Sequence, residues 1–388
     1  MDPVIVHDKT TQESEAETRT RPFPEVPSVA LFGWGAATGN GGMCSDIARL
    51  SNLVNHWVVP NHPTKEYHEP YLEQAFAHVN LVPCSRRDNT TVKNILSQVD
   101  GILYVENPCF DPGTVDIVGM AKQMGVAVVG IPMWEWWPMD ASWAQRTDAV
   151  WAVTEYTRQY LQACSVMQYA RGVEVAWKDR IVGGQWGVDL GEFPFVQRAT
   201  ASTFGFVNGN GGYKGRKGLE SVLAAFNDMP DVSLLVFSQV PIASGALPDN
   251  VRTFQCETDT RSEVYQGADV YLFPSYWEGL CHGLYEAQSS GAIVVTTDDC
   301  PMNECGTPWL LSPSRIETEY IDGRDTRKAV VAPDELIRIC RHLHQTDIHA
   351  QSREARDRMA CQFDLRETIN ELDAFIKAVC SECRRRLG

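Results

Sequence analysis

The sequence has no long hydrophobic run. None of its 388 residues belongs to a stretch approaching the roughly 18 to 20 consecutive apolar residues that a membrane helix needs. The first residues also lack the basic and then apolar pattern of a signal peptide. We therefore expect a cytoplasmic protein (in the host cytoplasm if it is viral) without an integral membrane segment.

Positive charge is scarce as well. The chain has 34 Lys and Arg residues against 50 Asp and Glu residues, a formal net charge of −16. Binding to phosphate backbones or to an anionic lipid surface draws on a basic surface. A polyanionic acceptor is therefore disfavoured, although the overall charge leaves room for a local basic groove.

Clustered metal ligands are also lacking. Cys380 and Cys383 form one C-x-x-C, and Cys300 and Cys305 are separated by four residues. Neither pair has a second pair or a group of histidines at the spacing of a zinc site. The chain also contains no D-x-D, a pair of carboxylates that can bind a metal. We expect reduced thiols and no metal.

What the sequence does contain is a repeated alternation of short apolar runs and helix-length stretches. This pattern indicates an α/β fold with parallel sheets covered on both faces. The length exceeds what one core usually organises, so we expect two Rossmann-like, doubly wound domains. The expected strands are 29–34, 56–60, 101–105, 126–132 and 149–153 in the first domain, and 203–209, 232–238, 250–254, 269–274 and 292–297 in the second.

Composition divides the chain into four parts. Residues 1–27 are polar and carry prolines, which predicts a mobile N-terminal tail. Residues 28–190 form the first domain and residues 196–362 the second, with the glycine-rich stretch 183–195 as the linker. Residues 363–388 have apolar positions on one helical face and form a C-terminal helix.

One stretch carries most of the chemistry. In PSYWEGLCHGLYEAQSSGAIVVTTDDCPMNE, residues 274–304, Glu278 lies in a loop after a strand and Glu286 lies on the following helix. Loops at the carboxyl ends of parallel strands line the ligand crevice, and a helix N-terminus there favours phosphate. A carboxylate one turn into that helix can accept two hydrogen bonds from ribose hydroxyls. The pattern therefore predicts a nucleotide site.

This stretch closely resembles the E-x7-E signature of retaining GT-B glycosyltransferases, especially the large family 4 group. The resemblance covers roughly residues 28–304 and includes TGNGGM (38–43), PMWEWWPMD (132–140), DAVWAVTEYTRQYL (148–161), WGVDLGEF (186–193) and YKGRKGLESVLAAF (213–226). Within the signature itself, the matching positions are Pro274, Ser275, Glu278, Gly279, Leu284, Glu286, Ala287, Gly291, residues 294–297 and Glu304.

The resemblance implies a GT-B fold, in which the two domains face each other across a cleft and the last helix returns to the first domain. It also implies transfer of a hexose or pentose from a UDP- or GDP-type nucleotide diphosphate sugar to a hydroxyl group. The anomeric configuration would be retained, with neither a metal nor another cofactor. The acceptor stays open between a glycan, a small molecule, a lipid and a modified DNA base.

Residue roles follow by resemblance. Lys217 and Arg216 would stabilise the departing diphosphate, and Glu278 would contact the donor sugar. The family arginine that usually precedes the lysine falls near Gly211 here, so Arg216 or Lys214 takes its place. The expected catalytic residues are Glu278, Lys217 and Arg216; the expected donor-binding residues are Gly41, Gly42, Lys217, Glu278, Cys281, His282, Gly283, Leu284 and Glu286; and the expected acceptor-binding residues are Trp134, Glu135, Trp136 and Glu106.

Plainer explanations exist for each motif taken alone. A glycine loop is more often only a turn, and the tryptophans of segment 132–140 more often pack than bind sugar. Glu106 and Asn107 stand where many relatives have a histidine, so we assign no catalytic histidine. Two other functions remain: a sugar transferase acting on a modified base of viral DNA, and a noncatalytic nucleotide-sugar-binding protein. A sugar-nucleotide epimerase lacks support, because its acid and base pair is not identifiable in the sequence.

Overall fold

The structure is a computed structural model that describes most of the chain. It covers residues 25–36, 38–60, 76–84, 88–108, 116–209, 212, 215–242, 247–255, 261–321 and 324–387. Residues 1–24 of the predicted tail, together with Gly211, Lys214 and Cys256, lie outside the described residues.

The first sheet is parallel throughout. Seven described strands lie in the order β3-β2-β1-β4-β5-β6-β7. Its strands are β1 (Val29–Phe32), β2 (Val54–Pro60), β3 (Asn80–Cys84), β4 (Gly101–Val105), β5 (Ala127–Ile131), β6 (Ala149–Ala152) and β7 (Ile181–Gly183). The elements between them are α1 (Gly39–Leu50), α2 (Asn89–Leu96), α3 (Ile117–Gln123), the short 3-10 helix η2 (Trp134–Trp136), α4 (Ser142–Arg146) and α5 (Glu155–Ala170).

The second sheet repeats the same construction. Six described strands lie in the order β10-β9-β8-β11-β12-β13, again parallel. They are β8 (Thr203–Gly209), β9 (Ser233–Ser238), β10 (Val251–Gln255), β11 (Val270–Phe273), β12 (Ile293–Thr297) and β13 (Trp309–Leu311). The helical elements are α6 (Leu219–Asn227), η5 (Arg261–Tyr265), α7 (His282–Ser289), η6 (Met302–Cys305), α8 (Pro333–Leu343) and α9 (His349–Gln362). The predicted α/β class with two parallel sheets is confirmed.

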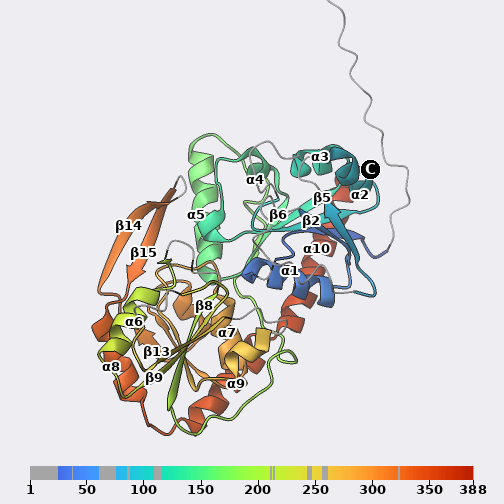
Figure 1. Cartoon of the computed structure of the whole chain (residues 1–388). Helices are drawn as coiled ribbons and strands as arrows, with labels where there is room; N and C mark the ends of the chain where they lie inside the picture. Colours follow the sequence, from blue (N-terminus) through green and yellow to red (C-terminus); the bar gives the residue numbers. More distant parts are fainter. Residues whose placement is uncertain are drawn as a thin grey trace, which may run out of the picture.

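The chain passes between the two sheets twice, and the two passages touch. The amide of Val188, after β7, donates to the carbonyl of Phe363 at 2.8 Å, and Leu365 donates back to Val188 at 3.3 Å. A side chain on Gly187 would place its Cβ 2.5 Å from the amide nitrogen of Leu365, so only glycine allows this approach. Beyond this point α10 (Leu365–Leu387) runs back along the first sheet, where it contacts β5 and α1 (Figure 1).

A contact between the halves also caps a helix. The carboxylate of Glu304, in η6, accepts hydrogen bonds from the amides of Glu155 and Tyr156, each at 2.8 Å. These are the first two amides of α5, which have no partner within their own helix. A residue of the second half therefore satisfies the N-terminus of a helix of the first.

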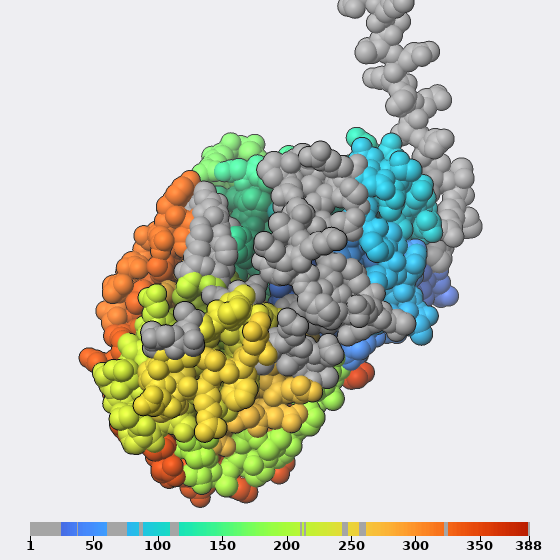
Figure 2. All heavy atoms as spheres, viewed as in Figure 1, coloured from blue at the N-terminus to red at the C-terminus, as the bar shows by residue number. Residues whose placement is uncertain are grey.

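Several elements differ from the prediction. Strands β3, β7 and β13 and the antiparallel pair β14 (Arg315–Ile321) and β15 (Arg324–Val330) were not predicted. Strands β14 and β15 form a hairpin that lies at the surface along the left edge of the molecule (Figure 2). Its sequence carries alternating charges in place of an apolar run, because its outer face meets water. Helix α1 also begins at Gly39, so the predicted glycine loop is in part the first turn of a helix.

Candidate active site

The loop after β11 carries the first glutamate of the predicted pair. β11 ends at Phe273 in the interior of the second sheet. The chain passes close to the turn before α6 there, because a Cβ on Gly218 would lie 2.6 Å from the carbonyl oxygen of Pro274. Gly218 also has a φ of +77°, a left-handed conformation that suits glycine. This close approach brings residues 216 and 217 to the glutamate loop.

Glu278 lies between two cations. Its side chain is almost fully buried, and Oε1 accepts from Nζ of Lys217 at 2.6 Å. Nη2 of Arg216 lies 3.5 Å from the other carboxylate oxygen. The three residues predicted to be catalytic are therefore in mutual contact.

The charges of this group outweigh its burial. Burial alone would raise the pKa of Glu278, but the ammonium of Lys217 and the guanidinium of Arg216 lower it to about 2. Glu278 is therefore ionised at neutral pH, and the pKa of Arg216 stays above its ordinary value despite burial. The second half thus presents two largely buried cations, partly neutralised by one carboxylate.

The first half contributes a carboxylate of its own. Glu135 lies in η2, just after β5, and is 6% exposed. Its Oε1 accepts from Nη1 of Arg216 at 3.1 Å. Next to it, the indole Nε1 of Trp134 donates to the backbone carbonyl of Glu278 at 2.6 Å. Glu135, Arg216, Lys217 and Glu278 form what we call the interdomain cluster.

Glu135 titrates far from its ordinary range. Burial is the largest cause, and the neighbouring charges of Glu278 and Glu106 act in the same direction, while Arg216 opposes them. Together they raise the pKa of Glu135 to about 7. Glu135 is therefore the carboxyl of the interdomain cluster that changes charge near neutral pH.

The other residues expected to bind the acceptor lie around this cluster. Trp134 packs with Trp277 and Ile321, so its ring faces are used in packing. Trp136 is partly buried against the main core. Glu106 directly follows β4 with a φ of +60°, and Asn40 lies near enough to its carboxylate to lower its pKa. Burial raises the pKa of Glu106, while Arg216 opposes the rise.

The start of α7 faces the same cations. Sγ of Cys281 is 4.0 Å from Nζ of Lys217, and burial raises the pKa of this thiol to about 12. The pKa of His282 falls to about 3 because of burial and of the positive charges of Arg261 and Lys217. Cys281 and His282 are therefore both neutral at pH 7. Nε2 of His282 is buried and has no hydrogen-bond partner among the described residues.

The remaining donor-binding candidates are held in place by close packing. Leu284 is fully buried in the core, so its side chain faces away from solvent. A Cβ on Gly283 would lie 2.7 Å from the ring of Phe273. Gly41 and Gly42 lie in the first turn of α1, and a Cβ on Gly41 would lie 1.9 Å from the carbonyl oxygen of Ala36. Both Gly41 and Gly283 are thus required by packing.

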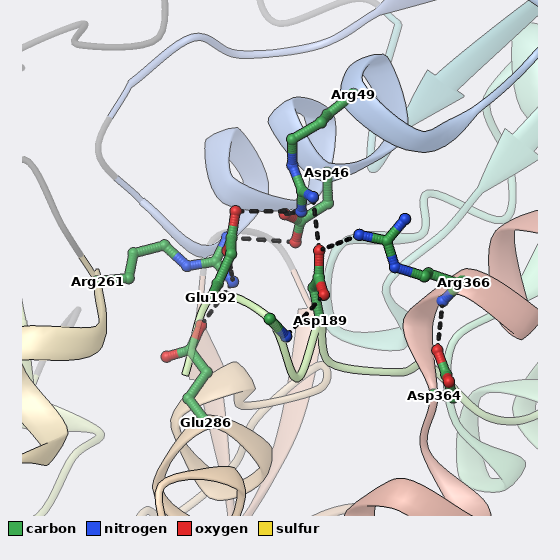
Figure 3. Close-up of polar contacts among 9 residues, drawn as sticks. Asp46, Arg49, Asp189, Glu192, Arg261, Glu286, Asp364 and Arg366 are labelled. Carbon is green, nitrogen blue, oxygen red and sulfur yellow. Dashed lines mark hydrogen bonds and ion pairs between the residues drawn. The ribbon is translucent and has the colours of Figure 1, made fainter. Parts of the chain in front are cut away.

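Glu286 lies on α7, one turn beyond Gly283, and contacts a different cation. Its Oε1 is 3.0 Å from Nη2 of Arg261, at the start of η5. The same guanidinium reaches Asp46 of α1 at 3.2 Å (Figure 3). Arg261 therefore bridges the predicted ribose-binding residue and the first half of the molecule.

This bridge belongs to a larger set of ion pairs. Arg49, one turn along α1 from Asp46, contacts Asp189 at 2.5 Å and Glu192 at 3.1 Å, both in the segment after β7 (Figure 3). Arg366 at the start of α10 reaches Asp189 at 3.4 Å. We call this set the linker network; its members are Asp46, Arg49, Asp189, Glu192, Arg261, Glu286 and Arg366.

Sequence reasoning missed Arg261, Asp46 and Asn40. A signal for Arg261 was present, because η5 follows the carboxyl end of β10, and such ends line the crevice of a parallel sheet. Asp46 and Arg49 are three residues apart on a helix, a spacing that is common on solvated faces. Nothing in the sequence places Asn40 beside Glu106.

Within residues 25–387, excluding the gaps given above, no group of three or more His, Cys, Asp or Glu side chains is arranged to hold a metal ion. None of the helices described there is long and apolar enough to cross a membrane.

Comparison with known sequences points to one family. A sequence profile of the family "Glycosyl transferases group 1" matches residues 211–321, which contain Lys217, Glu278 and Glu286. A GDP-mannose-dependent alpha-mannosyltransferase of Corynebacterium glutamicum is 25% identical over 183 residues. That alignment spans 46% of this chain and 42% of the mannosyltransferase.

Comparison with solved structures extends over both halves. A glycosyltransferase from Rickettsia africae superposes with a TM-score of 0.64 at 12% identity, covering 92% of this chain and 99% of that structure. Sucrose-phosphate synthase from Thermosynechococcus elongatus gives 0.59 at 13% identity, with the same coverage of both chains. The two parallel sheets and these likenesses show that the chain has a GT-B fold, and the segment that carries the glutamate loop matches the group 1 glycosyltransferase family.

Proposed function

We propose that the chain transfers a sugar from a nucleotide diphosphate sugar to a hydroxyl acceptor, with retention of the anomeric configuration and without a metal or another cofactor. The observation that supports this most is the interdomain cluster. It brings the cations Lys217 and Arg216 to Glu278, beside the N-terminus of α7. Cations and a helix N-terminus together favour a bound diphosphate.

The proposed roles follow from the charge that develops in the reaction. Breaking the bond between sugar and phosphate leaves positive charge at the anomeric carbon and negative charge on the diphosphate. Lys217 and Arg216 stabilise the departing diphosphate, and each contributes about 3 kcal/mol to lowering the barrier, as single donors of oxyanion sites do. Glu278 contacts donor hydroxyls or the developing oxocarbenium ion. The departing phosphate oxygen takes the acceptor proton on the same face of the sugar.

Glu286 is the proposed ribose ligand. Two ribose hydroxyls would donate to its carboxylate, as the E-x7-E resemblance implies. Because Oε1 of Glu286 now contacts Arg261 at 3.0 Å, the ribose has to displace that guanidinium. Asp46 can still bind Arg261 after the ribose has displaced it from Glu286, since Asp46 contacts the other terminal nitrogen of the guanidinium.

The donor is of the UDP or GDP type. The name of the Corynebacterium glutamicum relative favours GDP-mannose, and this donor is the first to test. The acceptor enters from the first half, near Glu135, Glu106 and Trp136. It is a glycan, a small molecule, a lipid or a modified DNA base, and the net charge of −16 argues against a nucleic acid.

The test is a panel of UDP-, GDP- and ADP-sugars, measured by thermal shift and by release of the nucleoside diphosphate. At least one donor should stabilise the wild-type chain, and Glu286→Ala should weaken that effect. If no nucleotide sugar binds, the proposal is wrong. Binding without release in the presence of a broad acceptor set would favour a noncatalytic binding protein.

A further inference from the structure

The two carboxylate oxygens of Glu135 have unequal surroundings. Oε1 accepts from Arg216 at 3.1 Å, whereas Oε2 is buried and has no hydrogen-bond partner among the described residues. The backbone of Gly279 closes over Oε2, because a Cβ on that glycine would lie 2.4 Å from it. A buried carboxylate with one partner keeps its charge only while that partner stays.

The other charges facing Glu135 have the same sign as its own. Glu278, in the loop after β11, and Glu106, after β4, both disfavour its ionised form. Lys217 is directed to Glu278. Among the described groups that act on Glu135, Arg216 is therefore the cation that keeps it ionised, and burial and both glutamates oppose it.

A bound diphosphate changes this balance in two ways. It attracts Arg216 away from Glu135, and it adds negative charge beside Glu135. Both changes favour the protonated carboxyl. We propose that Glu135 is a positioning residue that holds Arg216 in place from the first half of the molecule and takes up a proton from solvent when the donor diphosphate binds.

This inference rests on the proposed function and deepens it. The uptake is a simple protonation, in which the carboxylate and one proton from the buffer give a neutral carboxylic acid. Its purpose is to let Arg216 transfer its contact to the diphosphate without leaving a bare buried charge behind. Because binding then takes up a proton, nucleotide affinity falls as the pH rises above the pKa of Glu135 in the free chain, about 7.

The experiment is titration calorimetry of the full chain with the nucleoside diphosphate that binds best, UDP or GDP. Titrations at about pH 8 in two buffers of different ionisation enthalpy give the protons taken up per nucleotide. A free diphosphate, whose last pKa is about 6, is fully ionised there and contributes none. We expect close to one proton for the wild type and almost none for Glu135→Gln.

Two further measurements make the result decisive. Glu106→Gln, the same change at the neighbouring buried carboxyl, should keep the uptake; loss of uptake there but not in Glu135→Gln would assign the proton to Glu106 and overturn the inference. If Glu135→Gln does not fold, the wild-type affinity between about pH 7 and 9 decides, because a flat profile contradicts proton uptake. Nucleotide binding without uptake ends this inference alone, whereas no nucleotide binding at all ends the proposed function with it.

Discussion

The interdomain cluster and the linker network both join the two halves with ion pairs, but they differ in exposure. Glu278 and Glu135 keep 3% and 6% of their side-chain surface, and neither partner cation exceeds 21%. In the linker network, Asp46 and Asp189 are as buried, at 3% and 5%, but Glu192 keeps 36% and Arg366 keeps 62%. Dehydrated charges respond strongly to a new ion, whereas hydrated ones respond weakly.

The interdomain cluster and the linker network also lie in different kinds of segment. Residues of the interdomain cluster lie in loops and in a short 3-10 helix just after strands, where a ligand can replace a partner. The linker network ties together α1, the segment after β7 and the start of α10, and Glu286 is the member that also belongs to the proposed donor site (Figure 3). We infer that the first group serves chemistry and the second serves the connection between the halves.

The strongest test of this difference is to remove one cation from each group. Lys217→Met should lower kcat about 100- to 1,000-fold, because it removes a donor aimed at developing negative charge. Arg49→Met, the same charge change in the linker network, should leave kcat within a few-fold and lower the melting temperature instead. Steady-state kinetics with thermal melts test both variants, and equal losses of kcat would remove the distinction.

The second prediction concerns Glu286, the member of the linker network that also belongs to the proposed donor site. Glu286→Ala should weaken nucleotide binding about 10- to 100-fold, since hydrogen bonds to a charged group contribute roughly 1.5 to 3 kcal/mol. Arg261→Met breaks the same ion pair from its other side but leaves the ribose ligand, so nucleotide affinity should rise a few-fold. Calorimetry distinguishes the two, and parallel losses would contradict displacement of Arg261 by ribose.

The pH dependence of folding stability gives a further test of the difference between the two groups. Glu135 has a raised pKa in the folded chain, so its contribution to stability is largest below its unfolded pKa of about 4.3 and falls as the pH rises towards about 7. Glu135→Gln removes this penalty, which is on the order of 3 kcal/mol. The melting temperature of the variant relative to the wild type should therefore rise between about pH 5 and pH 8.

Asp189 is the counterpart in the linker network. Burial would raise its pKa, but Arg49, the amide of Gly191 and Arg366 together lower it. Its contribution to stability is thus present above about pH 4 and lost below it. Asp189→Asn should flatten the acid side of the melting profile, where Glu135→Gln changes nothing.

The smallest effect is expected outside both groups. Glu304→Ala leaves the first two amides of α5 without acceptors, which should cost about 1 kcal/mol in unfolding free energy. The matched control is Glu174→Ala, an exposed glutamate paired with Lys178, where the loss of unfolding free energy should be smaller. Urea unfolding measures both, and equal values would mean that the capping contact between the halves adds nothing.

The sequence predicts the buried parts of this molecule better than its surface. Strands such as β4 and β12 are continuous apolar runs because both sheet faces are covered, and that pattern is visible directly. β14 carries Arg315, Glu317 and Glu319 on a hairpin that borders water, so no apolar periodicity marks it. β7 has three residues, too few to show any period.

The candidate site likewise has a part that the sequence predicts and a part that it does not. Glu278, Lys217 and Arg216 were predicted from one local motif and one helix start, and they are in contact. Which group partners each cation depends on distant segments. Glu135 reaches Arg216 across 81 positions of sequence and Arg261 reaches Asp46 across 215. Pairings of this kind are set by how the halves meet, which no local pattern records.

The contact between Val188 and residues 363–365 means that the second sheet is an insertion within the first domain. The chain leaves the first domain after β7 and re-enters it as α10, with the two passages hydrogen-bonded to each other. A short loop joining residue 188 to residue 365 would therefore close the first domain without stretching it. The covalent connections between the two halves are therefore confined to a single place in the fold.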